Sequence, residues 1–447
     1  MGHPNVVFIF SDQQRAQDAG YMGNPDVKTP VMDALSKQSV VFRHAVSGHP
    51  VCSPYRASLI TGQYSLTHKV IANNVCLGND AVSLAQAYSA GGYETAYIGK
   101  WHIDGHGARS NFIPKERRQG FDFWRVLECT HDYNNSYYYG DENIKLKWDG
   151  YDAEAQTRCA QEYIKSRNRE KPFLLVMSWG PPHNPYETAP ERFKALYDPQ
   201  SLTLRPNVPP ELAKQTGNEL AGYYAHISAL DWLLGEMLKT IDDEGLAEDT
   251  LLVYTSDHGD MLGSQGASRK QHPWDESILV PFMLRYPALL GRQRREISMP
   301  INTPDIMPTL LELSGLPIPS TVEGMSFRKY ITGEKPEEDR AAFIQCPHPF
   351  GEFTKLESGR EYRGVRTMRY TYTRDLNGPW LLYDNMEDPY QMKNLIGVPG
   401  YKELAEKLDG ELQSILDKQG DKFLTGEHYM NLFGYPMNER GVVPYTP

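Results

Sequence analysis

The sequence predicts an α/β fold with a mixed, mostly parallel sheet sandwiched by helices, followed by a smaller C-terminal antiparallel sheet packed by one helix. Through the first 335 residues, short runs of apolar residues alternate with segments of helical periodicity. This alternation is typical of buried parallel strands joined by helices. Beyond residue 335, closely spaced β-like stretches precede one helix, which indicates a small antiparallel sheet. We therefore expect two domains, 1–335 and 336–447.

The larger domain is expected to alternate between buried strands and amphipathic helices. The expected strands are 5–10, 94–98, 173–177, 251–255 and 280–286. The expected helices are one that starts at Thr29-Pro30, then 54–61, 83–90, 153–166, 217–243, and one from Thr303 to about 315. Helix 217–243 carries apolar residues at helical spacing, which is typical of a face packed in the core. Residues 105–150 lack such a pattern, and we expect them to be irregular.

The smaller domain is expected to follow a linker. Residues 333–340 are charged and contain proline, which is typical of a segment between domains. The expected strands after it are 342–345, 362–367, 370–372 and 380–383, and the expected helix is 401–418. Strands this closely spaced are joined by short turns and so pair antiparallel.

Composition limits the classes of function. Hydrophobic residues make up 40% of the 447 residues and charged residues 23%, which is an ordinary globular composition. The formal net charge of -11 argues against a protein that wraps nucleic acid. No apolar run approaches the roughly 20 residues of a membrane span, so we expect no membrane partner either. No leader precedes the first strand, so we expect a cytoplasmic protein, or a periplasmic or secreted one if a leader was trimmed.

One cysteine is placed where a thiolate is favoured. The five cysteines are scattered, so one thiol with a special role fits better than a disulfide framework. Cys52 precedes an expected helix for which Ser53 is the expected N-cap, Pro54 suits the first position and Gly62 the position past the end. The free N–H groups of a helix start favour a thiolate. Arg56, one turn later, adds a planar cation suited to an oxyanion.

Polar side chains directly follow four of the expected strands. They are Asp12 and Gln13, then Lys100 and His102, then His183, and finally Asp257 and His258. Taken singly, a turn-capping Asp or a surface Lys is the commoner interpretation. Because the carboxyl ends of strands in such sheets meet at one crevice, we expect these groups to lie together. Two carboxylates and an amide oxygen suit Ca²⁺ or Mg²⁺, while the imidazole of His258 leaves Mn²⁺ open.

Four motifs in order resemble one family. The pattern Cys52-x-Pro54-x-Arg56 followed by Ala-Ser-Leu-Ile-Thr-Gly resembles the signature of the type I sulfatases, which belong to the alkaline-phosphatase-like superfamily. Gly-Lys-Trp-His at 99–102, Pro-Pro-His at 181–183 and Ser-Asp-His-Gly at 256–259 resemble further family motifs. The resemblance runs from residue 5 to about residue 395. It implies that 1–335 is the catalytic domain, and that a maturation enzyme oxidises Cys52 to formylglycine.

The resemblance also implies residue roles. The metal ligands would be Asp12, Gln13, the modified Cys52, Asp257 and His258, with Gln13 standing where the family often has a second Asp. Lys100 would bridge nucleophile and sulfate, His102 would hydrogen-bond the formylglycine, and Lys270, thirteen positions after Asp257, would contact a sulfate oxygen. Arg56 would offset charge, and His183 or Lys270 would protonate the leaving alcohol. The implied reaction is hydrolysis of a sulfate ester.

An aromatic loop indicates the class of substrate. Within 105–150, His131 and Tyr133 are interpreted either as part of a substrate pocket, because sugar rings stack on aromatic faces, or as residues that simply pack the loop. Asn73 is interpreted either as a substrate contact or as a turn residue. These features favour a sulfated mono- or oligosaccharide.

Three alternatives stay open. The first is a phosphonate monoester or phosphodiester hydrolase on the same scaffold, with which Gln13, Asn73 and His258 are compatible. The second is a non-catalytic binder of sulfated glycans. The third is a metal-dependent phosphatase, which would need Ser or Thr in place of Cys52. The complete Gly-Lys-Trp-His motif favours sulfate esters over the first. Intact Cys52, both lysines and all the candidate metal ligands argue against the second, and the cysteine at position 52 argues against the third.

Overall fold

The computed structural model describes residues 3–445 and is built around an eight-stranded mixed sheet. Its strands are, in spatial order, β12 (Arg295–Ile297), β2 (Val40–Phe42), β11 (Phe282–Arg285), β9 (Thr250–Ser256), β1 (Asn5–Asp12), β8 (Phe173–Pro182), β4 (Glu94–Lys100) and β5 (Phe123–Leu127). From β9 to β5 every neighbouring pair is parallel, whereas β11 is antiparallel to both of its neighbours. The predicted mixed, mostly parallel sheet is confirmed.

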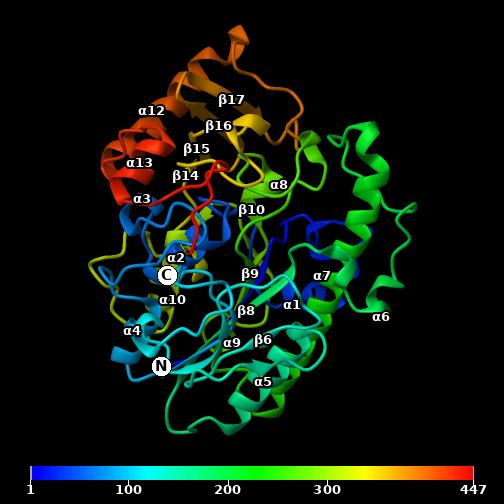
Figure 1. The fold of residues 1–447 in the computed structure, drawn as a ribbon, viewed down its shortest axis with the longest axis vertical. Helices are drawn as coiled ribbons and strands as arrows, with labels where there is room; N and C mark the ends of the chain where they lie inside the picture. The colour runs from blue at the N-terminus through cyan, green and yellow to red at the C-terminus, as the bar shows by residue number, and fades with distance from the viewer. Residues whose placement is uncertain (1–2, 446–447) are drawn as a thin grey trace.

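Helices cover both faces of this sheet (Figure 1). One face packs against α1 (Pro30–Ser36), α5 (Asp152–Ser166) and α7 (Ala213–Asp243), and the other against α2 (Cys52–Thr61), α4 (Leu84–Ala90) and α10 (Thr303–Leu313). Side chains alternate along β1, so that Val7 and Ile9 contact the first layer while Phe8 and Phe10 contact the second. Burial on both faces explains why β1 is apolar without interruption from Val6 to Phe10.

Several short elements escaped prediction. Residues 105–150 are not wholly irregular, since they contain the edge strand β5 and the hairpin of β6 (Tyr137–Tyr138) and β7 (Leu146–Lys147). The expected strand 280–286 is divided at Pro281, which has no N–H to donate, into β10 (Leu279–Val280) and β11. β10 joins β3 (Ala45–Val46) and β13 (Ile301–Asn302) in a three-stranded sheet. The remaining short helices are α3 (Ser65–His68), α6 (Glu191–Lys194), α8 (Asp275–Ile278), α9 (Pro287–Leu290) and α11 (Arg328–Ile331).

The start of α2 differs from its prediction. Cys52 is the first helical residue and Val51, not Ser53, holds the N-cap position. The Ser53 hydroxyl is engaged elsewhere, because it donates to the carbonyl oxygen of His102 at 2.5 Å. Gly62 does end the helix in the left-handed region, with a φ of 66°. Cys52 therefore lies at a helix N-terminus, as expected, although Ser53 does not cap it.

The C-terminal part is a four-stranded antiparallel sheet with one helix across it. The strands are β14 (Ala342–Cys346), β15 (Tyr362–Arg366), β16 (Tyr370–Asp375) and β17 (Gly378–Asp384). α12 (Lys402–Gln419) packs Leu408, Leu412 and Leu416 against this sheet, as predicted. α13 (Gly426–Phe433) returns to the core of the larger part. Because the two parts share core residues in this way, the division at 335/336 stays a prediction.

None of the helices within residues 3–445 is both long enough and apolar enough to cross a membrane.

Candidate active site

Four strand ends and one helix start meet at the same edge of the main sheet. Asp12 is the last residue of β1 and Lys100 the last of β4, while His183 and Asp257 directly follow β8 and β9. These strands are neighbours and run parallel, so their carboxyl ends point the same way. The N-terminus of α2 places Cys52 against this edge. The structure thus brings together side chains that are distant in the sequence, as the strand ends predicted.

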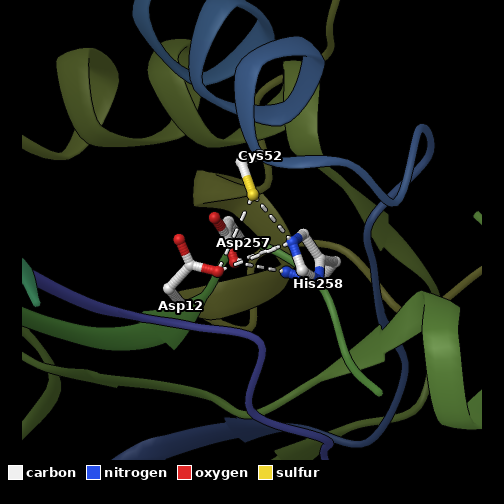
Figure 2. A group of neighbouring side chains, drawn as sticks. All are labelled: Asp12, Cys52, Asp257 and His258. Carbon is white, nitrogen blue, oxygen red and sulfur yellow. Dashed lines mark hydrogen bonds and ion pairs between the residues drawn. The ribbon is translucent and has the colours of Figure 1, made fainter. Parts of the chain in front are cut away.

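Asp12, Cys52, Asp257 and His258 form a buried cluster (Figure 2). The sulfur of Cys52 lies 3.2 Å from Nε2 of His258 and 3.8 Å from Oδ1 of Asp12. Nε2 of His258 is 3.6 Å from Oδ1 of Asp12 and 3.6 Å from Oδ1 of Asp257. Figure 2 shows Cys52 reaching from its helix toward the two carboxylates and the imidazole. The four groups therefore face a common centre.

This donor set fits a divalent cation. Nδ1 of His258 lies 2.9 Å from the carbonyl oxygen of Gly259, and since a carbonyl only accepts, Nδ1 carries a proton. In the neutral imidazole, the form that binds a metal, Nε2 would then offer its lone pair to the cluster. Burial lowers the pKa of His258, but Asp257 and Cys52 outweigh burial and raise this pKa to about 9. The surroundings of Nε2 thus favour positive charge. Carboxylate oxygens suit Ca²⁺ and Mg²⁺, and an imidazole nitrogen is also compatible with Mn²⁺.

Arg56 joins the two carboxylates of the cluster. Its Nη2 donates to Oδ2 of Asp12 at 3.2 Å and to Oδ2 of Asp257 at 3.1 Å. Its Nη1 donates to the carbonyl oxygen of Lys100 at 2.7 Å and to Oγ of Ser178 at 2.6 Å. The side chain is only 1% exposed. Arg56 therefore orients the two carboxylates and offsets their negative charge, and its guanidinium is not exposed to solvent.

Asp12 is held as a carboxylate. Nζ of Lys100 donates to its Oδ2 at 2.5 Å, on the same oxygen that Arg56 contacts. Burial raises the pKa of Asp12, but Lys100, His183 and Arg56 together hold this pKa well below its usual range. An ionised Asp12 at neutral pH keeps a negative ligand available for a cation.

The environment of Cys52 favours an anion. Burial and Asp12 raise the pKa of its thiol, whereas Lys100, Lys270 and His258 lower it. The lowering prevails, so the pKa of this thiol lies below its usual value. Positive charge is thus gathered around position 52, as expected for a helix N-terminus flanked by lysines.

Lys270 and His183 form a hydrogen-bonded pair. Nζ of Lys270 lies 2.8 Å from Nε2 of His183 and donates to Oε1 of Gln13 at 2.9 Å. Nδ1 of His183 lies 2.8 Å from the carbonyl oxygen of Asn184, so Nδ1 carries a proton and Nε2 accepts from the lysine. Burial, followed by Lys270, lowers the pKa of His183 well below its usual range. The ring of His131 stacks on His183 with centroids 4.4 Å apart and planes 14° apart.

Gln13 is fixed by hydrogen bonds on every side. Its backbone has a φ of 76°, in the left-handed region that a glutamine rarely adopts. Its N–H donates to Asp257 at 3.0 Å, and its carbonyl accepts from the hydroxyl of Tyr223 at 2.7 Å. Its side-chain Nε2 donates to Oδ2 of Asp260 at 2.6 Å, while Oε1 accepts from Lys270. The amide oxygen therefore faces the active-site lysine, and metal ligation by Gln13 stays a prediction.

His102 and Asn73 lie beside the start of α2. His102 is buried, and its carbonyl accepts from the Ser53 hydroxyl. Oδ1 of Asn73 accepts from the N–H of Ser53 at 3.1 Å, so this side chain satisfies one free donor at the helix start. A contact between Asn73 and substrate stays a prediction, as does the hydrogen bond of His102 to the residue at position 52.

Tyr133 packs into the protein core. Its side chain is fully buried, and its hydroxyl donates to the carbonyl oxygens of Gly180 at 3.2 Å and Asn184 at 3.4 Å. The ring thus supports the segment that carries His183 from below. This burial does not support a contact between Tyr133 and substrate, which stays a prediction, because a loop tyrosine that packs inward has the same sequence pattern as one that faces a ligand.

Comparison with known proteins identifies the family. The family described as Sulfatase matches residues 4–316, which is well over half of the chain. The chain belongs to the sulfatase family. A second description, N-sulphoglucosamine sulphohydrolase, C-terminal, matches residues 263–418 of this sulfatase.

Relatives along the whole chain are sulfatases too. Over 448 residues the sulfatase is 43% identical to a Formosa agariphila protein named ulvan-active sulfatase, covering 99% of this chain and 87% of the relative. It is 31% identical over 484 residues to an endo-4-O-sulfatase of Bacteroides thetaiotaomicron, covering 95% and 94% of the two chains. Its structure matches a putative sulfatase of Bacteroides fragilis with a TM-score of 0.86, 29% identity and coverage of 96% and 97%. The predicted class, a sulfuric ester hydrolase, is confirmed.

The fold alone does not separate sulfatases from their neighbours. A phosphonate monoester hydrolase of Agrobacterium radiobacter shares the fold with a TM-score of 0.74 at 22% identity, covering 99% of this chain and 100% of that one. At that identity the likeness concerns architecture only. The family match and the relatives above make the chain a sulfatase.

Three residues of the sulfatase site escaped the sequence analysis. Asp260, which holds the amide of Gln13, directly follows the Asp-His-Gly motif, so its position was a signal that could have been used. Ser178 binds Arg56 from within β8, and Asn74 lies 3.4 Å from His102. Neither of these two stands in a pattern that distinguishes it from an ordinary buried serine or turn asparagine.

Proposed function

We propose that this sulfatase removes sulfate from a carbohydrate sulfate ester, with formylglycine derived from Cys52 as nucleophile and a divalent cation as cofactor. One observation carries the proposal: Cys52 stands at a helix N-terminus, within 3.8 Å of both a buried carboxylate and an imidazole. The same edge of the sheet holds two buried lysines. Such a site combines a nucleophile position, cation ligands and anion-binding groups.

Cys52 and its neighbours define what the cofactors would do. A hydrated formylglycine at position 52 would supply a hydroxyl that attacks sulfur, and a divalent cation would offset the charge of the ester oxygens. Asp12, Asp257 and His258 would hold the cation, with Gln13 as a further oxygen donor. The partner required before catalysis is a formylglycine-generating maturation enzyme that oxidises Cys52.

Lys100 and Lys270 supply charge where the reaction needs it. A sulfate ester is a monoanion, and its transition state spreads negative charge over the oxygens. Lys100 is 6% exposed and Lys270 is 5% exposed, so both ammonium groups act in a largely water-free environment. There, positive charges interact with an anion more strongly than in water. Arg56 supports them indirectly by holding the carboxylates in place.

The leaving alcohol needs a proton, and the structure favours Lys270 as its source. The ammonium of Lys270 donates to Nε2 of His183, whose own proton is on Nδ1. His183 at neutral pH is therefore an acceptor in this pair. We infer that the proton moves from Lys270, directly or through Nε2 of His183, to the alcohol oxygen. His102 would accept the proton whose loss releases sulfate.

The substrate class rests on relatives and on the site's rim. The relatives named ulvan-active sulfatase and endo-4-O-sulfatase match nearly the whole chain, and the first of these names refers to a polysaccharide. His131 stacks on His183, the residue that we place beside the leaving alcohol. We therefore propose a sulfated oligosaccharide as substrate, with His131 and Asn73 contacting it, and ulvan oligosaccharides as the first compounds to test.

The deciding experiment has two parts. The mass of the peptide containing Cys52, from protein co-expressed with a formylglycine-generating enzyme, is expected to fall relative to the cysteine form. That protein is expected to release sulfate from at least one member of a panel of sulfated oligosaccharides, whereas Cys52→Ala is expected to release none. Turnover by Cys52→Ala would refute the nucleophile, and activity on aryl sulfates alone would refute the carbohydrate substrate.

A phosphonate ester provides the matched comparison. The same aryl alcohol is presented once as a sulfate monoester and once as a phosphonate monoester, and kcat/KM is measured for both. We expect the sulfate ester to be preferred. A preference for the phosphonate would favour the neighbouring class of hydrolase instead.

A further inference from the structure

His102 has one nitrogen with a partner and one without. Nε2 lies 3.4 Å from Oδ1 of Asn74. Nδ1 is buried and has no hydrogen-bond partner among the described residues. A buried ring nitrogen that is left unpaired is costly, so its state matters for what the residue does. Which of the two nitrogens carries the proton is decided by Asn74.

Asn74 is itself fixed by the C-terminal segment of the chain. Its Nδ2 donates to the carbonyl oxygen of Val443 at 2.8 Å, across 369 positions of sequence. A main-chain carbonyl can only accept, so the amide must present Nδ2 to Val443 and Oδ1 to His102. Oδ1 in turn can only accept, so Nε2 of His102 must carry the proton. The unpaired Nδ1 is then left with a free lone pair.

The surrounding backbone holds this arrangement rigidly. Asn74 has a φ of 65° and His102 a φ of 60°, both in the left-handed region. Asparagine tolerates this region well, whereas histidine is less common there. The carbonyl of His102 is held by the Ser53 hydroxyl at 2.5 Å, and Val443 is 3% exposed. Strained backbone of this kind persists only where its neighbours determine it, and it concentrates at functional sites.

We propose that Asn74, held by the main-chain oxygen of Val443, is a positioning residue that fixes His102 with its proton on Nε2 and a free lone pair on Nδ1. The C-terminal segment thereby becomes part of the active-site architecture, although it lies outside every motif of the sequence. Its contribution is a carbonyl oxygen, which every residue type possesses.

The consequence for turnover rests on the proposed function. When sulfate leaves with its bonding electron pair, a hydroxyl at position 52 must lose a proton so that the aldehyde carbonyl re-forms. With its lone pair free, Nδ1 of His102 would take that proton, and the residue would be an imidazolium until the proton passes to water. A His102 whose Nδ1 already carried a proton could not accept it. The tautomer therefore controls sulfate release and not the departure of the alcohol.

The test combines a spectroscopic and a kinetic measurement. The protein is labelled with ¹⁵N-histidine, and the signals of His102 are assigned by their loss in His102→Asn. In the wild type we expect a resolved Nε2–H and an unprotonated Nδ1. In Asn74→Gly, which tolerates the backbone, we expect averaged nitrogen shifts and rapid exchange. The matched control is Asn73→Gly, whose side chain bonds Ser53 instead, and we expect it to leave the His102 signals unchanged.

Kinetics separates positioning from a merely structural effect. In Asn74→Gly an aryl sulfate is expected to give a burst of alcohol equal to the enzyme concentration, followed by turnover slowed about 10- to 100-fold, because a positioned base contributes about 10²–10⁴-fold. Unchanged His102 signals in Asn74→Gly, or an Nδ1–H in the wild type, would overturn the proposal. A wild type with the expected tautomer but no sulfate release would instead refute the proposed function.

Discussion

Exchanging the amide of Gln13 and the carboxylate of Asp260 tests what orients the amide oxygen of Gln13 beside the cation site. Nε2 of Gln13 donates to Oδ2 of Asp260 at 2.6 Å, which leaves Oε1 facing Lys270. In Asp260→Asn the new amide competes as a donor, so Gln13 is expected to rotate and to turn its own NH₂ group toward the lysine. In Gln13→Glu two carboxylates meet instead. The double variant Gln13→Glu/Asp260→Asn restores one donor and one acceptor, with side chains of the original size.

The distance of 2.6 Å sets the magnitudes. A hydrogen bond to a charged group contributes about 1.5–3 kcal/mol. Its loss in Asp260→Asn should weaken cation binding roughly 10- to 150-fold, because about 1.4 kcal/mol corresponds to a factor of ten. Two unit charges at that distance repel by roughly 6 kcal/mol at an effective dielectric constant of about 20. Gln13→Glu alone should therefore bind the cation most weakly, and the double variant should recover most of the lost cation affinity.

Cation affinity is the quantity to measure, because it does not require the modified Cys52. Each protein is stripped with a chelator and titrated calorimetrically with Ca²⁺, Mg²⁺ and Mn²⁺, and thermal unfolding checks that it is folded. Tyr186→Phe is the matched control. It removes another donor to the same oxygen of Asp260 and leaves the contact with Gln13 in place. We expect it to weaken cation binding less than Asp260→Asn does.

Additivity would refute this reasoning. If the two single changes acted independently, the double variant would bind the cation more weakly than either of them. The same conclusion would follow if Tyr186→Phe and Asp260→Asn had equal effects, since the contact with Gln13 would then be irrelevant. Recovery in the double variant is expected only if the two side chains act as one hydrogen-bonded pair.

Three further predictions concern proton transfer and stability. His183→Phe should lower kcat/KM for a sugar sulfate by about 10²–10⁴-fold. It should lower kcat/KM for a nitrophenyl sulfate less, since nitrophenolate is a good leaving group that needs no proton. Equal losses for the two substrates would argue against the role of His183. Burial raises the pKa of Asp152 to about 8, so the folded state retains a proton that the unfolded state loses. The free energy of unfolding should therefore fall as pH rises from about 4 to about 8, by up to about 1.4 kcal/mol per pH unit. Urea titrations of Asp152→Asn should no longer show this slope. Asp421 is buried with the guanidinium of Arg363 2.5 Å away. Arg363→Met leaves this carboxylate without its partner and should lower the free energy of unfolding by about 3–5 kcal/mol in guanidinium titrations. A loss below about 1 kcal/mol would contradict the buried pair.

The positions of the site's main side chains followed from sequence because parallel sheets place function at strand ends. Asp12, Lys100, His183 and Asp257 each come at or directly after the end of an apolar run, and the structure brings all four to one edge. This inference needs only the locations of buried strands, which a continuous apolar sequence reveals. It does not need the strand order, which the sequence left undetermined.

What escaped prediction depends on contacts that leave little trace in sequence. Ser53 has the sequence of an N-cap, but its hydroxyl bonds the carbonyl of His102, and Val51 takes the position instead. Tyr133 packs inward although it belongs to an aromatic loop. Asn74 acts through the carbonyl of Val443, and a carbonyl is common to all residues. Local pattern therefore predicts which segments are strands and helices, whereas side-chain partners are chosen by the tertiary structure.

The balance of charge at the site gives Gln13 a further significance. The two carboxylates of the cluster are matched by Arg56 and Lys100, which bond directly to them. Beyond these ion pairs, Lys270 and a cation held by the cluster would add further positive charge for a sulfate ester, in a chain whose overall charge is -11. A carboxylate at position 13 would cancel part of this positive charge, whereas the neutral amide of Gln13 cancels none of it. The resemblance to the family implies Asp as the commoner residue there, so we propose that the amide of Gln13 would lower the affinity for a cation and keep a stronger field on an anionic substrate. Asp260 carries the corresponding negative charge one hydrogen bond further from the site.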